Sequence, residues 1–306
     1  MKQSKKILIA NRGVIAIRAL RAARELGYSV ASVYSTIDRD QKHLKLSDEA
    51  ICIGPPETKD SYLNEAAIIS AAELSGADAI YPGFGFLAEN ASFAEKCRES
   101  GFKFIGPDPE VIAIMGDKIK AKELAKSLNI PVVPGYEGEI STENEAIKIV
   151  EEIGYPVIIK ASAGGGGRGM RVVNSSDELW QSIQSAQNEA ELAFGDGKIF
   201  IEKYLKKPRH IEVQIFGNGK GEAVHLFTRD CSLQRKYQKI VEEAPALNID
   251  NQKLEEIQNL SVEACKKLNY EGAGTIEFLY ENNDFYFIEM NTRIQVEHTV
   301  TEMITG

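Results

Sequence analysis

Polar and apolar residues alternate near the C-terminal end of the sequence, in the run FYFIEMNTRIQVEHT. The polar members are Glu289, Asn291, Arg293, Gln295 and Glu297, and the apolar members are Ile288, Met290, Ile294 and Val296. Successive side chains of an extended chain point to opposite faces. The pattern therefore predicts a strand that carries a row of polar groups on one surface and an apolar backing on the other, which is the layout of a chemical site.

A second β-rich run, GTIEFLY, precedes the first, and turn-forming residues separate the two. Together the runs predict a β-hairpin. A loop at residues 282–284 would place Glu277 opposite Glu289 and Leu279 opposite Phe287, whereas a loop with an even number of residues would stagger the two acids. We predict the loop at residues 282–284.

Glu277 and Glu289 would then face each other across the hairpin. Facing carboxylates repel each other unless a cation lies between them, and hard divalent cations prefer oxygen ligands. Together with the amide oxygen of Asn291, the two acids predict a Mg²⁺ site, for which Mn²⁺ is the alternative metal. A solvated hairpin face with scattered charge is the other interpretation of this segment alone.

A glycine-rich run, YPVIIKASAGGGGRG, consists of an apolar strand that ends in Lys160 and a loop that follows it. Glycines let backbone N–H groups converge on an anion, and they let a loop move. Strand character resumes at residues 170–173, so the loop joins two strands and does not open a helix. This argues against a Walker loop and against a dinucleotide fingerprint. Alone, such a run is more often a linker, but its flanking strands and Lys160 favour a phosphate-binding flap.

These features together resemble the ATP-grasp superfamily and, within it, the biotin carboxylase module of biotin-dependent carboxylases. The resemblance covers the whole chain. It rests on the motifs ILIANRG, YPGFGFLAEN, FIGP, MGDK, GYPVIIKASAGGGGRGMRVV, RHIEVQIFG, RDCSLQRKYQKIVEEAPA and EMNTRIQVEHTVTEMITG, which occur in the family's order. It implies a chain of α/β and α+β class, with an ATP-grasp fold preceded by a Rossmann-like parallel-sheet domain.

Four segments are expected along the chain. Residues 1–115 alternate apolar strands with helical patterns, which predicts the Rossmann-like domain. A connecting helix at 116–131, an ATP-grasp lid at 132–204 and the catalytic subdomain at 205–306 follow. The family's catalytic domain continues past the last residue of this sequence, so we expect exposed apolar surface and impaired carboxylation of biotin unless another chain completes the site.

The resemblance implies a set of nucleotide-binding residues: Lys118, Lys160, Gly166, Gly167, Glu202, Lys203, Leu205, His210, Gln234, Tyr237, Glu277, Leu279 and Glu289. Lys118 and Lys160 would contact the phosphates, and the hinge at 202–205 would contact the adenine edge. Without the resemblance, that hinge is equally an ordinary edge strand. Tyr237 departs from the family's usual histidine, and a tyrosine cannot become cationic near neutral pH. Nucleotide affinity is therefore expected to differ, whereas the chemistry should be unaffected.

The implied reaction is phosphoryl transfer from ATP to bicarbonate, followed by carboxylation of biotin. Bicarbonate would be bound by Lys239, Arg293, Gln295 and Val296. Arg293 and Lys239 would supply positive charge, and the planar guanidinium suits a carboxylate-shaped anion. Glu297 would be the general base that removes the proton of bicarbonate. Carboxyphosphate would then decompose to carbon dioxide and phosphate, and the phosphate would deprotonate the biotin ureido nitrogen.

The implied partners are a biotin carboxyl carrier protein or domain that presents biotin as substrate, a carboxyltransferase, and a second copy of the chain in a homodimer. The acyl acceptor, for example acetyl-CoA, propionyl-CoA or pyruvate, belongs to the carboxyltransferase. A net charge of −9 argues against nucleic acid. The absence of a long apolar run or a signal-peptide pattern argues against a membrane and predicts a cytoplasmic protein. The four cysteines are scattered, which indicates reduced thiols.

Two other functions remain open at this stage. One is a different ATP-grasp ligase, such as an enzyme of the carbamoyl-phosphate type, which would share the lid and the metal-binding hairpin. The RIQVEH and QRKYQK motifs favour bicarbonate and biotin over this alternative. The other is a nucleotide-binding fragment without catalytic activity.

Overall fold

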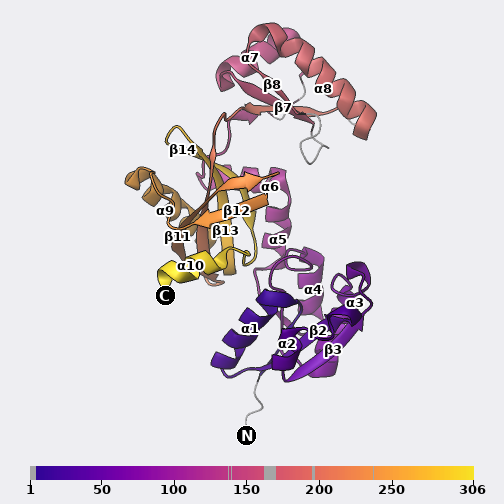
Figure 1. The fold of residues 1–306 in the computed structure, drawn as a ribbon. Coiled ribbons are helices and arrows are strands. Elements are labelled where there is room, and N and C mark those ends of the chain that lie inside the picture. The colour runs from indigo at the N-terminus through magenta and orange to yellow at the C-terminus, as the bar shows by residue number, and fades with distance from the viewer. Residues whose placement is uncertain (1–4, 137, 139, 162–169, 195–196, 237) are drawn as a thin grey trace. The chain divides into compact units, whose positions relative to one another are not determined.

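The fold is described from a computed structural model that covers residues 5–136, 138, 140–161, 170–194, 197–236 and 238–306. Of residues 118, 161, 193 and 194 only the backbone is described. The contacts divide the chain into two compact units, shown in Figure 1. Unit 1 comprises Met1–Ile130 and Arg209–Gly306, and unit 2 comprises Pro131–Pro208. The four-segment division made from the sequence remains a prediction.

The N-terminal part of unit 1 is built on a parallel five-stranded sheet of order β3-β2-β1-β4-β5. Its strands are β1 (Lys6–Ile9), β2 (Ser29–Ser35), β3 (Glu49–Gly54), β4 (Ala79–Tyr81) and β5 (Lys103–Phe104). Its helices are α1 (Gly13–Glu25), α2 (Lys42–Leu46), α3 (Glu65–Ser75) and α4 (Ala91–Glu99), with 3₁₀ turns at Thr36–Asp38 and Thr58–Asp60. The predicted Rossmann-like parallel sheet is confirmed.

Neighbouring residues of β1 belong to different cores, as expected for a sheet covered on both faces. Ile9 packs with α1 residues such as Leu20, and Leu8 packs in a second core with Ile68 of α3 and Phe93 of α4. Gly27 follows α1 and has a φ of +77°. A left-handed backbone is easily adopted by glycine and ends a helix.

Two helices, α5 (Pro109–Gly116) and α6 (Lys118–Ser127), follow the parallel sheet. Asp108 caps α5 by accepting from the backbone N–H of Glu110, and Asp117 caps α6 by accepting from those of Ile119 and Lys120. Short acidic side chains at these positions satisfy amide donors that have no partner inside the helix.

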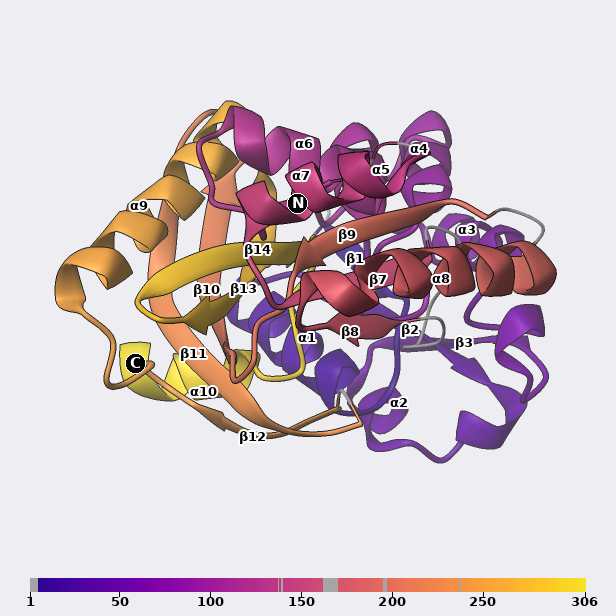
Figure 2. The same ribbon diagram turned by 90° about the horizontal axis from the view of Figure 1, so that it is seen from above.

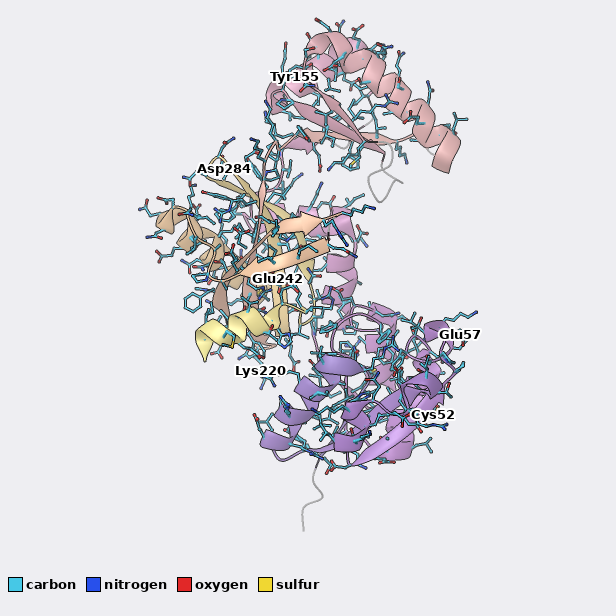
Figure 3. All side chains as sticks on the ribbon, viewed as in Figure 1. Cys52, Glu57, Tyr155, Lys220, Glu242 and Asp284 are labelled. Atoms are coloured by element: carbon cyan, nitrogen blue, oxygen red, sulfur yellow. The ribbon has the colours of Figure 1, made fainter. Side chains whose placement is uncertain are left out.

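The C-terminal part of unit 1 is an antiparallel sheet of order β12-β11-β10-β13-β14 (Figure 2). Its strands are β10 (Arg209–Asn218), β11 (Ala223–Arg235), β12 (Gln238–Glu243), β13 (Glu271–Glu281) and β14 (Asp284–Asn291). Helix α9 (Asn251–Lys267) packs against β10 and β11, and helix α10 (His298–Thr305) packs against β11. Figure 3 labels Asp284, the first residue of β14, beside the hairpin turn. No helix among the described residues is long and apolar enough to cross a membrane.

The hairpin of β13 and β14 corrects one prediction and confirms another. Glu281 pairs with Asp284, so the turn contains only Asn282 and Asn283, and the loop predicted at residues 282–284 is wrong. Leu279 consequently faces Tyr286 and not the predicted Phe287. Both turn residues have positive φ, 54° and 67°, which asparagine tolerates and which suits the tight turns of hairpins.

Glu277 nevertheless faces Glu289, as predicted. The register shifts between Glu277 and Phe278, because Phe278 pairs with Phe287 and Ile288 is left as an extra residue in β14. A β-bulge of this kind adds one residue to one strand. The bulge thus brings the two acids into register, which the turn alone would not do.

Unit 2 contains an antiparallel sheet of order β6-β9-β7-β8. Its strands are β6 (Gly135–Tyr136), β7 (Val157–Ala161), β8 (Arg171–Val173) and β9 (Ile199–Lys203), and its helices are α7 (Glu143–Ile153) and α8 (Leu179–Phe194), with a 3₁₀ turn at Ser176–Glu178. The helices and the sheet share a core that includes Val150, Ile159 and Ile183. The glycine-rich run does connect two strands, β7 and β8, as predicted, although residues 162–169 lie outside the described residues.

The hairpin turn leads to a stability prediction. Replacing Asn282 by valine should lower the free energy of unfolding by about 1–2 kcal/mol, because a β-branched residue is strained at positive φ. Replacing Asn282 by glycine should preserve stability. Urea denaturation followed by circular dichroism measures both, and equal stability of the valine and glycine variants would contradict the turn described here.

Candidate active site

Four charged residues form a row across the antiparallel sheet of unit 1. Arg229 of β11 pairs with Glu212 of β10, Glu212 pairs with Glu277 of β13, and Glu277 pairs with Glu289 of β14. Arg229 and Glu212 are fully buried, and Glu277 is 5% exposed. Three adjacent carboxylates, two of them buried, repel one another strongly unless cations lie among them.

Lys239 of β12 supplies one such cation. Its Nζ donates to Oε2 of Glu212 at 2.7 Å, to Oε1 of Glu277 at 2.8 Å and to Oε1 of Glu297 at 2.7 Å. All three ammonium hydrogens therefore have carboxylate acceptors. The sequence predicted Lys239 as a positive group of the site, and the structure adds that it holds three acids together.

The charges in this cluster shift one another's pKa values. Burial raises the pKa of Glu277, but the neighbouring His210 and Lys239 outweigh it and lower the pKa to about 2. Burial lowers the pKa of Lys239, but Glu212 and Glu277 outweigh it and raise the pKa above its usual value. At neutral pH Glu277 is consequently a carboxylate and Lys239 a protonated ammonium group.

The segment after β14 corrects the predicted strand. Strand β14 ends at Asn291, so the alternation does not continue as an extended chain to Glu297. Gln295 and Glu297 are buried, with 3% and 8% exposure, whereas Val296 is 63% exposed and does not form the predicted apolar backing. Gln295 and Glu297 point into the charged cluster because their partners, Arg229 of β11, Lys239 of β12 and Glu277 of β13, lie there.

Glu297, the predicted general base, precedes helix α10. Burial raises the pKa of Glu297, but the hydrogen bond from Lys239 and the nearby positive charges outweigh it and lower the pKa. It is thus a carboxylate at neutral pH, which is the form that accepts a proton. Its basicity would increase if an anion shared the ammonium group of Lys239.

Arg293, the predicted bicarbonate ligand, is fixed from two directions within unit 1. Its Nε donates to Oε2 of Glu89 at 2.6 Å, and its Nη2 donates to Oδ1 of Asn291 at 2.8 Å. The other carboxylate oxygen of Glu89 accepts from the backbone N–H of Thr292 at 3.1 Å. Glu89 follows β4 in the parallel sheet, so that part of unit 1 orients the arginine.

The remaining predicted nucleotide residues of unit 1 lie on the same sheet. His210 faces Leu279 across β10 and β13, and its Nε2 lies 3.0 Å from Oε2 of Glu277. Gln234 faces Lys239 across β11 and β12, and its Nε2 donates to the backbone oxygen of Cys231 at 2.9 Å. The structure thus places these three predicted residues, His210, Gln234 and Leu279, on the sheet that carries the charged row.

The predicted residues of unit 2 form a separate group. Lys160 on β7 donates to Oε2 of Glu202 on β9 at 2.6 Å. Lys203 donates to the backbone oxygens of Gly154 and Tyr155 at 2.9 and 3.0 Å, and Leu205 lies just after β9. Strand β9 lies between β6 and β7, so it is not the edge strand of the alternative interpretation.

Other predicted nucleotide-binding groups lie outside the described part of the chain. They are Gly166, Gly167, Tyr237 and the side chain of Lys118. Their predicted contacts remain predictions.

Glu277, Glu289 and Asn291 suit a divalent cation in their chemistry. The two acids are paired across the hairpin, and Asn291 faces Thr275 on the next row of the same ladder. Carboxylate and amide oxygens are the donors that Mg²⁺ prefers. Asn291 donates its Nδ2 to Oε1 of Glu277 at 2.8 Å, which is consistent with a site where these groups adjoin. The metal-binding assignment itself remains a prediction.

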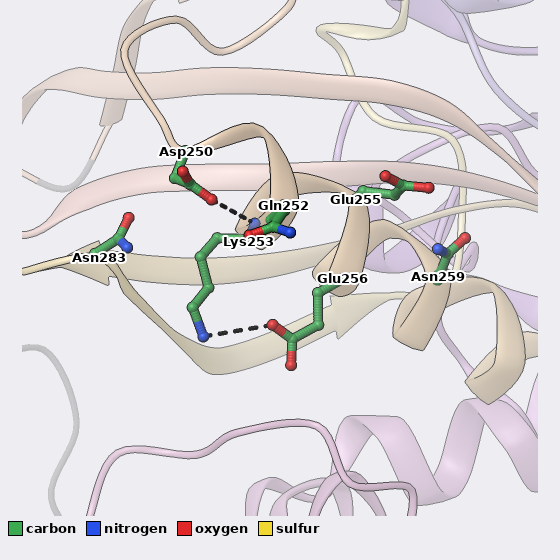
Figure 4. Close-up of a pocket in the computed structure, with 7 residues that line it drawn as sticks. All are labelled: Asp250, Gln252, Lys253, Glu255, Glu256, Asn259 and Asn283. Atoms are coloured by element: carbon green, nitrogen blue, oxygen red, sulfur yellow. Dashed lines mark hydrogen bonds and ion pairs between the residues drawn. The ribbon is translucent and has the colours of Figure 1, made fainter.

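A surface hollow of unit 1 lies away from these residues. Figure 4 shows its lining on α9 and at the hairpin turn. On α9, Lys253 and Glu256 form an ion pair with an N–O distance of 3.4 Å. Its lining residues are Asp250, Gln252, Lys253, Glu255, Glu256, Asn259 and Asn283. None of them is a predicted site residue, and helical acids paired with a lysine one turn away are ordinary solvated groups.

Comparison with known proteins identifies the family. The model described as "Biotin carboxylase, N-terminal domain" matches residues 3–112, and that described as "Carbamoyl-phosphate synthase L chain, ATP binding domain" matches residues 117–306. The biotin carboxylase of Pseudomonas aeruginosa is 56% identical over 302 residues, which cover 98% of this chain and 67% of that protein. The chain belongs to the biotin carboxylase family.

Solved structures of biotin carboxylases share the fold. A complex of Campylobacter jejuni biotin carboxylase with β-γ-ATP is 52% identical, with a TM-score of 0.84, and is matched over 98% of this chain and 68% of that one. The biotin carboxylase domain of Hydrogenobacter thermophilus 2-oxoglutarate carboxylase, a dimer with MgADP, ADP and bicarbonate, is 49% identical, with a TM-score of 0.82, and is matched over 100% and 68%. The predicted family and fold class are confirmed.

Sequence reasoning missed three residues that contact the predicted site residues: Glu89, Glu212 and Arg229. A signal for Glu212 was present, because His210, Glu212 and Gln214 alternate with apolar residues in RHIEVQIFG as the later residues do in FIEMN. Arg229 and Glu89 stand in motifs that were recognised, but no local pattern distinguishes them from surface charges. Only the folded chain shows that Arg229 bonds Glu212 and that Glu89 bonds Arg293.

The charged row predicts a specific pH dependence. Since the folded-state pKa of Glu277 is about 2 against an ordinary value of 4.5, its ionisation stabilises the fold above pH 4.5, and this stabilisation is lost as the pH falls towards 2. A Glu277→Gln variant should be less stable at pH 7 and should lose less stability over that window.

Urea denaturation between pH 2 and 7 measures this difference. The matched control is Glu255→Gln, which changes an exposed acid on α9. Parallel stability curves for the parent chain and the Glu277→Gln variant would contradict the assigned ionisation.

Proposed function

We propose that the chain catalyses the ATP- and bicarbonate-dependent carboxylation of biotin through carboxyphosphate, the first half-reaction of a biotin-dependent carboxylase. The overall change is ATP, bicarbonate and biotin to ADP, phosphate and carboxybiotin. Membership of the biotin carboxylase family supports this activity, and so does the chemistry of the residues around Lys239.

The observation that carries the proposal is the contact of Lys239 with both Glu277 and Glu297. One cation thereby joins a carboxylate suited to binding a metal and a carboxylate suited to accepting a proton. Phosphoryl transfer to bicarbonate needs both functions, because the acceptor must lose a proton while negative charge on the phosphates is neutralised.

Each residue has a proposed role. Lys239 and Arg293 bind the bicarbonate anion, and the guanidinium provides a planar pair of donors. Glu297 accepts the proton of bicarbonate, whose oxygen then forms a bond to the γ-phosphorus as the bond from that phosphorus to ADP breaks. The backbone at Val296 adds to the pocket, since the segment around it turns towards the charged row.

A divalent cation would be held by Glu277 and Glu289, with Asn291 beside them. Its contribution, when bound, is positive charge that neutralises the phosphate oxygens of ATP. His210, Gln234 and Leu279 are proposed to line the nucleotide on this sheet, and Lys160, Glu202, Lys203 and Leu205 of unit 2 are proposed to contact it as well.

The proposed partners follow from the reaction. Biotin must reach the site on a carrier protein or domain, and a carboxyltransferase must consume the carboxybiotin. Self-association into a homodimer is also proposed, and its support is the dimeric biotin carboxylase domain from Hydrogenobacter thermophilus.

Nucleotide cleavage by the chain tests the proposal. ADP formation should require bicarbonate and should increase when free biotin is added. Turnover that is indifferent to biotin would favour another ATP-grasp ligase, and ATP binding without any turnover would favour a non-catalytic nucleotide-binding fragment.

Replacing Glu297 by glutamine should lower bicarbonate-dependent ADP formation by about 10²–10⁴-fold, the usual contribution of general-base catalysis. The KM for ATP should change little, because Glu297 is not assigned to the nucleotide. The Glu255→Gln variant is the control and should keep the parent rate. An unchanged rate for Glu297→Gln would contradict the assigned base.

A further inference from the structure

Arg229 is a fully buried cation that no predicted role includes. An arginine remains charged at any pH that a folded protein experiences, so burial without partners would be strongly unfavourable. The acceptors of its N–H groups therefore show which side chains the buried arginine holds in place.

Every N–H group of the guanidinium has an acceptor. Nε donates to Glu212 at 2.8 Å, Nη1 to Gln214 at 2.6 Å and to Thr301 at 2.7 Å, and Nη2 to Thr275 at 3.3 Å and to Gln295 at 2.7 Å. These acceptors come from strands β10 and β13, helix α10 and the segment that precedes it. A lysine, with three donors and no planar fork, cannot reproduce this set.

The bond to Gln295 decides which way its amide faces. Oε1 of Gln295 accepts from Arg229, so Nε2 points the other way and donates to Oε1 of Glu277 at 2.7 Å. The reversed amide would place an NH₂ group against a guanidinium and an oxygen against a carboxylate. Arg229 therefore sets the donor that Gln295 presents to the carboxylate beside Lys239.

The hydrogen bond from Arg229 to Glu212 provides a second connection to Lys239. Oε1 of Glu212 accepts from Arg229 and from the thiol of Cys231 at 2.9 Å, and Oε2 accepts from Lys239. Arg229 thus contacts both Glu212 and Gln295, and each of these contacts the groups around Lys239. It does so from the sheet interior, with no exposed surface that could touch a substrate.

We infer that Arg229 is a positioning residue for the bicarbonate pocket, which acts by fixing the side chain of Gln295 and with it the segment that carries Arg293 and Glu297. This inference rests on the proposed function for its substrate. The positioning itself is a property of the folded chain and can be measured without turnover.

The kinetic test compares Arg229→Lys with Thr275→Val. Arg229→Lys should raise the KM for bicarbonate at least tenfold and leave the KM for ATP within twofold. Thr275→Val is the matched control, because Thr275 is equally buried and bonds the same guanidinium but does not contact Gln295. Equal changes in bicarbonate KM for the two variants would overturn the inference.

A double variant separates positioning from general destabilisation. If Arg229 acts through Gln295, the Arg229→Lys change should add less than threefold to the bicarbonate KM of a Gln295→Ala chain, because the group being positioned is gone. Full multiplication of the two single effects would overturn the inference.

Hydrogen exchange of the Gln295 side-chain amide tests the positioning role of Arg229 separately from the proposed carboxylation of biotin. In ¹⁵N-labelled protein, Arg229→Lys should accelerate this exchange at least tenfold, whereas Thr275→Val should not. A parent chain that shows no bicarbonate-dependent turnover would defeat the proposed function, whereas unchanged exchange in a folded Arg229→Lys chain would defeat the positioning role.

Discussion

The contact of one lysine ammonium with three buried carboxylates is the interaction on which the rest of the site depends. Strand pairing alone would place Glu212, Glu277 and Glu289 side by side, an arrangement that repulsion would disrupt. Lys239 bonds two of these acids and also Glu297, so it joins β10, β12, β13 and the start of α10. Arg229 is a second buried cation, and it donates to the carboxylate of Glu212. The fold can therefore keep these carboxylate oxygens in its interior.

The register of the sheet explains how this concentration of charge arises. The Asn282–Asn283 turn would offset the acids by one residue, and the bulge at Ile288 returns Glu289 to a position opposite Glu277. The parallel sheet contributes through Glu89, which bonds both the backbone of Thr292 and the side chain of Arg293. A local feature of the hairpin and a contact distant in sequence thus jointly determine the positions of Glu289 and Arg293.

The sequence predicted the parts of this arrangement that depend on nearby residues. Period-two alternation identified the hairpin and the acids Glu277 and Glu289, and glycine spacing identified a loop between strands. The alternation does not mark a strand as far as Glu297, however, because Gln295 and Glu297 lie in an irregular segment whose side chains are held by residues of β11, β12 and β13. Glu212 and Arg229 could not be paired from the sequence, since the two residues lie 17 positions apart and the register of β10 and β11 shifts between Val213 and Ile215. Only the folded sheet shows their bond.

The most direct test of the central claim is the stability of a Lys239→Met chain as a function of pH. Removing the cation should destabilise the sheet by about 3–5 kcal/mol at pH 7, because buried carboxylates would lose their partner. The deficit should shrink as the pH falls below about 4.5, since protonation removes the repulsion in the variant while it weakens the parent. Hydrogen exchange of the β10 and β13 amides, measured with EDTA present, reports this difference. A loss below about 1 kcal/mol at pH 7, or one that does not change with pH, would contradict the account.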